Sequence, residues 1–204
     1  MCILYAAGFT KLCLLIIVQA RAYKPEISAT LKPGKIKLST QDWLVDTTES
    51  FALMGTFLAI IHPPLYQAGC EVFHRLIADP SIIKEGDAAL EVLQYWTSPF
   101  SGYGLISNCT TPLHRDNNSQ GCWYDCLTTI GPYSGSRLCL DNLGVQLQYE
   151  SGTMVALLGK LLRHGTTEAS GSRICVAQYM RDNVVERLGI ESPGWMTMAN
   201  YGIQ

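Results

Sequence analysis

The sequence predicts an α+β fold, in which N-terminal helices pack on one sheet of a double-stranded β-helix (jelly-roll) core. Two observations favour this class. Apolar residues recur at helical spacing in several segments of residues 1–100. From Tyr103 onward the chain consists of short segments rich in strand-forming residues, which Gly, Pro, Asn and Asp separate at hairpin-like intervals. Several short strands at close spacing are typical of a β-sandwich or barrel.

Helices are expected in three segments of the N-terminal half. Apolar residues follow a helical period over 50–61 and 66–77, and Pro63 and Pro64 separate these two segments. A third, short amphipathic helix is expected over 87–96, before Pro99.

Strands are expected in the C-terminal half, at 103–109, 123–130, 137–140, 145–149, 153–158, 161–164 and 173–180. The chain has no internal repeat and no linker long enough to divide domains. We therefore expect a single domain over 1–204, with 1–100 as mainly helical support and 101–190 as the jelly-roll core that carries the active site.

The N-terminal segment resembles a secretory signal. An apolar run over 12–18 precedes Ala20, Arg21 and Ala22, which imitate a cleavage site. However, no positive charge precedes the first apolar residues, and Lys11 interrupts the stretch. The run is also too short to span a bilayer, so no membrane partner is expected. We favour a buried helix here, with a secretory signal as the alternative.

Composition indicates a globular chain. Apolar residues make up 48% of the chain, and the formal net charge of −2 gives no overall attraction to nucleic acid, although a local basic patch is compatible with it. The eight cysteines include no C-x-x-C pair, so most are expected to be small buried apolar residues in a reducing compartment.

An H-x-D motif, His114 to Asp116, is the strongest chemical signal. In an extended segment, residues two apart project to the same side, so the imidazole and the carboxylate converge. His164 lies on a later predicted strand, and antiparallel folding could bring it opposite this pair. Two histidines and one carboxylate form the set that holds Fe(II) while leaving positions open for co-substrate and oxygen. The alternative is that both histidines are ordinary buried core residues.

Arg173 follows His164 after a glycine-containing turn and begins an apolar predicted strand. If 2-oxoglutarate binds the metal through its keto-acid end, its distal carboxylate requires a cation deeper in the core. The planar guanidinium matches a carboxylate bidentately. The alternative is a surface arginine in an ion pair.

Asn108 lies shortly before the H-x-D motif and could donate its side-chain amide to 2-oxoglutarate. It also begins a glycosylation sequon with Cys109 and Thr110, should the chain be secreted. Arg115 and residues 117–119 flank the motif and could contact a substrate, or simply form a solvated loop.

Taken together, the segments 111–117, 123–125, 131–133, 152–157, 163–165 and 179–182 resemble the fungal branch of the TET/JBP dioxygenases. The resemblance covers approximately residues 38–188. It implies iron ligands at His114, Asp116 and His164, a 2-oxoglutarate arginine at Arg173, and a co-substrate or base contact near Asn108.

The resemblance also implies a function: oxidation of a methylated nucleobase flipped out of DNA, with Fe(II), 2-oxoglutarate and O2. 5-Methylcytosine, oxidised to 5-hydroxymethylcytosine and further, is the expected substrate, and the nucleus the expected compartment. Trp123, Tyr124 and Tyr103 are candidates for stacking on the base, with a core role as the alternative. Two other functions stay open: hydroxylation of a protein or small molecule, and a non-catalytic DNA-binding descendant.

Overall fold

Antiparallel strand pairing organises the C-terminal half of the chain into sheets. A computed structural model describes residues 8–13, 24–28, 31 and 39–201. The described residues divide into two compact units, one within 1–11 and 103–179 and the other within 12–102 and 180–204.

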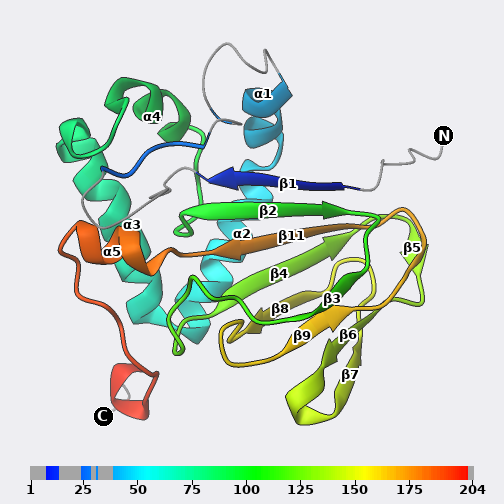
Figure 1. Cartoon of the computed structure of the whole chain (residues 1–204). Helices are drawn as coiled ribbons and strands as arrows, with labels where there is room; N and C mark the ends of the chain where they lie inside the picture. The colour runs from blue at the N-terminus through cyan, green and yellow to red at the C-terminus, as the bar shows by residue number, and fades with distance from the viewer. Residues whose placement is uncertain (1–7, 14–23, 29–30, 32–38, 202–204) are drawn as a thin grey trace. The chain divides into compact units, whose positions relative to one another are not determined.

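The first unit contains a five-stranded and a four-stranded sheet (Figure 1). In spatial order, the five-stranded sheet comprises β1 (Gly8–Cys13), β2 (Gly102–Ser107), β11 (Ile174–Tyr179), β4 (Asp125–Ile130) and β8 (Met154–Leu157). The four-stranded sheet comprises β3 (Thr111–His114), β9 (His164–Thr166), β6 (Arg137–Leu140) and β7 (Val145–Gln148). A short pair, β5 (Tyr133–Ser134) and β10 (Ser170–Gly171), completes the strands of this unit.

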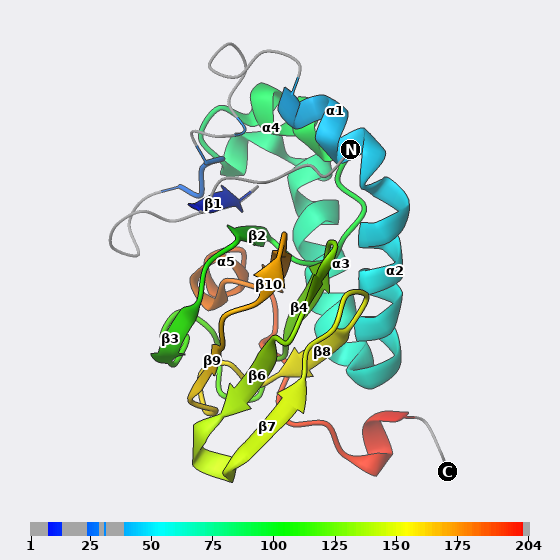
Figure 2. The ribbon, with the colours of Figure 1, turned by 90° about the vertical axis from the view of Figure 1, so that its right-hand side faces the viewer.

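The chain passes repeatedly from one sheet to the other. From β2 it crosses to β3, returns to β4, crosses to β6 and β7, and then visits β8, β9 and β11 in turn. Figure 2 shows β3, β9, β6 and β7 as a layer separate from β2, β4 and β8. This alternation is the connectivity of a jelly roll.

Apolar side chains from both sheets form one core. Leu127, Leu157 and Cys175 come from the five-stranded sheet, and Leu138 and Leu140 from β6 of the other. All five side chains are buried. Burying such side chains stabilises the fold by about 1.5–3 kcal/mol each.

The second unit is helical. Its helices are α1 (Ser39–Asp46), α2 (Thr48–Ile61), α3 (Pro63–Ala78), α4 (Gly86–Leu93) and α5 (Asp182–Arg187), with the short 3-10 turns η1 (Pro80–Ile82) and η3 (Met198–Tyr201). At the start of α3, the Leu65 N–H donates to His62 Nδ1. His62 Nε2 lies 3.2 Å from the Gly194 carbonyl oxygen, so this buried histidine has a structural role.

The predicted α+β class, with a jelly-roll core and N-terminal helices, is confirmed. The three predicted helices correspond to α2, α3 and α4. That the two units form one domain, with the helices packed on a sheet, stays a prediction.

Several elements differ from the sequence expectations, including the helices α1 and α5, which were not expected. Gly8–Cys13 is a strand beside β2, not a helix, because a short apolar run fits either conformation and a neighbouring strand supplies its hydrogen bonds. The rest of the N-terminal segment, 1–7 and 14–23, lies outside the described residues. The strand expected from residue 161 begins only at His164, because the Leu158 carbonyl accepts from the N–H groups of Leu161 and Leu162 and closes a turn. Thr111–His114 forms an additional strand.

The cysteines are less buried than the composition predicts. All six whose side chains are described are free thiols, but only Cys126 and Cys175 are buried. Among the described residues, no helix has the length and apolar character needed to cross a membrane.

Candidate active site

The two histidines of the predicted site face each other across one strand ladder. His114 ends β3 and His164 begins β9, and the two residues are direct partners in the antiparallel register. Their ring centroids lie 4.4 Å apart. Gly165 makes this approach possible, because a Cβ there would lie 2.6 Å from the Thr111 carbonyl oxygen on β3. The strand pairing therefore juxtaposes two residues that are far apart in the sequence.

Backbone carbonyls orient both imidazole rings. His114 Nδ1 lies 2.8 Å from the Pro112 carbonyl oxygen, and His164 Nδ1 lies 2.9 Å from the Leu162 carbonyl oxygen. A carbonyl oxygen can only accept, so each Nδ1 carries the hydrogen and donates it. In a neutral imidazole of this tautomer, Nε2 keeps its lone pair, which is the form in which histidine binds a metal.

Asp116 completes the group between the two rings. Its Oδ1 lies 3.6 Å from His114 Nε2, and its Oδ2 lies 3.6 Å from His164 Nε2. The backbone holds this aspartate as well, because the Asp116 N–H donates to the Gly159 carbonyl at 3.0 Å. One ligand atom from each of the three residues lies within 4.8 Å of the others. The three side chains could thus bind one metal ion.

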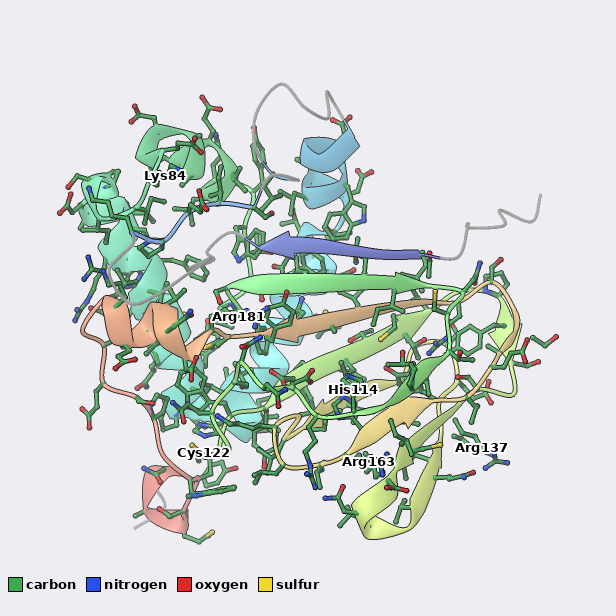
Figure 3. The ribbon with its side chains drawn as sticks, viewed as in Figure 1. Lys84, His114, Cys122, Arg137, Arg163 and Arg181 are labelled. Carbon is green, nitrogen blue, oxygen red and sulfur yellow. The ribbon has the colours of Figure 1, made fainter. Side chains whose placement is uncertain are left out.

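The three side chains differ in their access to solvent. His164 is 6% exposed at its side chain, whereas those of His114 and Asp116 are 41% and 43% exposed. Burial lowers the pKa of His164, and the neighbouring His114 acts in the same direction, against opposing effects of Leu162 and Asp116. His164 is consequently neutral near pH 7. The group is therefore accessible to solvent on the side of His114 and Asp116; Figure 3 labels His114, which ends β3.

A second carboxylate lies near the group. Asp125, at the start of β4, is 4% exposed. A Cβ added at Gly159 would lie 2.5 Å from Asp116 Oδ2 and closer still to Asp125 Oδ2. The absence of a side chain at Gly159 therefore leaves the space that both carboxylates occupy.

Arg173 lies directly before β11 and is only 2% exposed. Its Nη2 donates to the Cys109 carbonyl at 2.7 Å and to Thr166 Oγ1 at 3.2 Å, while the Tyr149 ring centroid lies 5.9 Å from its Cζ. Its Nη1 is buried and has no hydrogen-bond partner. Among the described residues, no carboxylate forms an ion pair with it, so the predicted alternative of a surface ion pair is wrong.

Of the described side chains near Arg173, Tyr149 and Cys175 supply no negative charge. Burial raises the pKa of Tyr149 and of Cys175, so the phenol and the thiol both remain neutral near pH 7. A buried cation without a counter-ion is costly. The environment of Arg173 therefore favours a bound anion.

Asn108 contacts Arg173 through both backbone and side chain. Its N–H donates to the Arg173 carbonyl at 2.8 Å, and its Oδ1 accepts from the Arg173 N–H at 2.7 Å. A direct contact between its amide group and 2-oxoglutarate stays a prediction.

The aromatic candidates from the sequence, and the arginines next to His114 and His164, lie in different environments. Trp123 and Tyr103 are buried at 1% and 0% exposure, which favours the core alternative over stacking on a base, and Tyr124 is partly buried. Arg115 is exposed, and its Nε donates to the Leu161 carbonyl at 3.1 Å. Arg163, labelled in Figure 3, pairs with Asp141 at 2.9 Å.

Sequence reasoning missed four residues around the site. Thr166 could have been found, because it lies two positions after His164 on the same strand and shares its face. Nothing in the sequence indicates that Tyr149 lies against Arg173, or that Gly159 and Asp125 lie beside Asp116. These contacts depend on long-range strand pairing.

Comparisons with known proteins identify the family and the fold of the chain. Residues 25–182 match the Tet_JBP family, described as the oxygenase domain of the 2OGFeDO superfamily. The solved structure "NgTET1 in complex with 5mC DNA" superposes with a TM-score of 0.57 at 10% identity, covering 86% of this chain and 61% of that chain. The similarity shows that the two proteins share a fold. The present chain spans about 61% of the length of the NgTET1 chain.

A Cupin 2 conserved barrel domain protein from Salinispora arenicola CNS-205 gives a TM-score of 0.29 at 14% identity, covering 43% of this chain and 69% of that chain. No curated protein matches the chain in sequence. The 2OGFeDO superfamily uses Fe(II) and 2-oxoglutarate. Because the family match covers most of its length, the chain belongs to the Tet_JBP family and carries an oxygenase domain of the 2OGFeDO superfamily.

Proposed function

We propose that the chain is an Fe(II)/2-oxoglutarate-dependent dioxygenase whose iron ligands are His114, Asp116 and His164. One observation carries the proposal. Two imidazoles with available Nε2 lone pairs and one carboxylate offer ligand atoms within 4.8 Å of one another. This donor set suits non-haem Fe(II) and leaves coordination positions open.

The environment of Arg173 supports 2-oxoglutarate as the co-substrate. Arg173 would hold the distal carboxylate, because its Nη1 is buried without a partner and its Nη2 is already fixed by Cys109 and Thr166. When bound, Fe(II) and 2-oxoglutarate would activate O2 for attack on an unactivated C–H bond, with 2-oxoglutarate oxidised to succinate and CO2. The chain's own residues orient the ligands and supply the charge that recognises the co-substrate.

We further propose 5-methylcytosine in DNA as the substrate, oxidised to 5-hydroxymethylcytosine and further. The proposal draws on family membership and on the fold shared with NgTET1, whose structure was solved with 5mC DNA. A base must leave the duplex before its methyl group can reach such a site. A place in the fungal branch of the family, a nuclear location and a part in DNA demethylation belong to the same proposal.

Oxidised nucleosides provide the test. Methylated DNA would be incubated at low salt with Fe(II), 2-oxoglutarate and air, and its nucleosides then measured by mass spectrometry together with succinate. We expect 5-hydroxymethylcytosine from the native protein and none from Asp116→Ala. Asp46→Ala is the matched control, because Asp46 is an exposed carboxylate at the end of α1 in the helical unit.

The products separate the alternatives. Succinate without oxidised cytosine would indicate an oxygenase acting on a protein or small molecule. If neither product forms although iron is bound, the proposed activity is wrong, and a non-catalytic DNA-binding descendant becomes the leading interpretation.

A further inference from the structure

We propose that Asn108 is a positioning residue, which holds Arg173 so that its unpaired Nη1 faces the 2-oxoglutarate carboxylate. The inference rests on the proposed function, in which Arg173 anchors the co-substrate. It assigns Asn108 a role different from the direct amide contact expected from the sequence.

Two hydrogen bonds join the backbone of Arg173 to Asn108. The Asn108 N–H donates to the Arg173 carbonyl at 2.8 Å, and the Arg173 N–H donates to Asn108 Oδ1 at 2.7 Å. Asn108 follows β2 and Arg173 precedes β11, which is the neighbour of β2 in the sheet. The side-chain oxygen of Asn108 thus acts as a further hydrogen-bond acceptor at the end of the paired strands β2 and β11.

The conformation of Asn108 explains why an asparagine suits this position. Its φ of 50° lies in the left-handed region, which asparagine adopts more readily than most residues with a side chain. Glycine would adopt this conformation too, but it has no side-chain oxygen to accept from Arg173. The position therefore combines a backbone requirement with a hydrogen-bonding requirement.

Residues 108 and 109 hold Arg173 at both ends. Asn108 binds its backbone, and the Cys109 carbonyl accepts from its Nη2 at 2.7 Å. The long side chain of arginine normally has many rotamers, and fixing both ends removes most of that freedom before the ligand binds. Nη1 is then left buried and available for the carboxylate.

The variant Asn108→Gly tests this arrangement, because glycine keeps the positive φ and removes the side-chain amide, including the oxygen that accepts from Arg173. In the ligand-free protein, NMR should show faster hydrogen exchange at the Arg173 amide. In the Fe(II)-loaded protein without oxygen, calorimetry should show 2-oxoglutarate binding weakened by about five- to tenfold, the size of one lost hydrogen bond. Glu85→Gly is the control, since Glu85 also has a positive φ of 60° but lies in the helical unit.

A double-mutant cycle separates positioning from direct contact. If Asn108 acts by positioning the guanidinium of Arg173, its effect should be small in an Arg173→Lys background, because lysine has no guanidinium to position. Asn108→Gly should then weaken 2-oxoglutarate binding much less in Arg173→Lys than in the native protein. Equal losses in both backgrounds would show a direct contact and overturn the proposal.

Unchanged exchange at the Arg173 amide in Asn108→Gly would also overturn it, whether or not 2-oxoglutarate binds. By contrast, if the native Fe(II)-loaded protein fails to bind 2-oxoglutarate, the proposed function itself is wrong.

Discussion

His114 and His164 are direct cross-strand partners on β3 and β9, and their Nε2 atoms each lie 3.6 Å from a different oxygen of Asp116. This arrangement places the carboxylate between two imidazoles whose Nδ1 atoms face backbone carbonyls.

Replacing His164 should remove iron binding. His164→Ala deletes one of the three proposed ligands, so Fe(II) affinity should fall by at least about 100-fold, given that even outer-shell losses cost ten- to a hundredfold. Anaerobic calorimetry with Fe(II) measures the change. His74→Ala, at an exposed histidine on α3, should bind iron as the native protein does. Native-like iron affinity in His164→Ala would exclude this histidine as a ligand.

A methyl group at Gly159 should disturb the iron site, although none of the proposed ligand residues is replaced. In Gly159→Ala the new Cβ would collide with the carboxylates of Asp116 and Asp125, so Fe(II) affinity should fall by about tenfold or more. The iron content of the variant after dialysis against limiting Fe(II) would measure this loss of affinity.

Gly121→Ala is the matched control for that substitution. Its Cβ would meet Leu161 at 3.5 Å, an ordinary contact, so iron binding should be unchanged. If both alanine variants retain full iron, the space beside Asp116 has no part in holding the metal.

Replacing Arg173 by lysine should weaken 2-oxoglutarate binding while the fold and iron affinity persist. Lysine keeps the charge but loses the fork that can bind a carboxylate bidentately, so Kd should rise by about ten- to a hundredfold. Arg137→Lys, on the exposed first position of β6, is the control. Equal affinity in the native protein and Arg173→Lys would remove Arg173 from the anchoring role.

DNA binding should be weak and depend on salt, because the chain carries a formal net charge of −2. Arg115 is exposed between two ligands, so Arg115→Ala should weaken binding and lower the salt slope by about 1. Lys160 is a second candidate for a contact with a DNA phosphate. Arg163→Ala should have a smaller effect, because Asp141 already pairs with that guanidinium. Fluorescence anisotropy across a salt series measures each slope, and an unchanged slope in Arg115→Ala would contradict a phosphate contact.

Local patterns were sufficient to predict much of the architecture. Helical periodicity located α2 and α3, and the dense alternation of strand-forming and turn residues after Tyr103 indicated a jelly roll. These features depend on neighbouring residues, whose side-chain directions follow from backbone geometry. A short apolar segment such as Gly8–Cys13 has no such signature, and only its pairing beside β2 makes it a strand.

The sequence by itself determined which groups could do the chemistry: an H-x-D motif in an extended segment, a later histidine, and an arginine entering an apolar strand. Only the tertiary structure decided how they meet. The register of β3 with β9 places His164 opposite His114, and the pairing at the end of β2 brings Asn108 to Arg173. Such contacts join residues that are distant along the chain, and a shift of one residue in register would turn each side chain to the opposite face of its sheet.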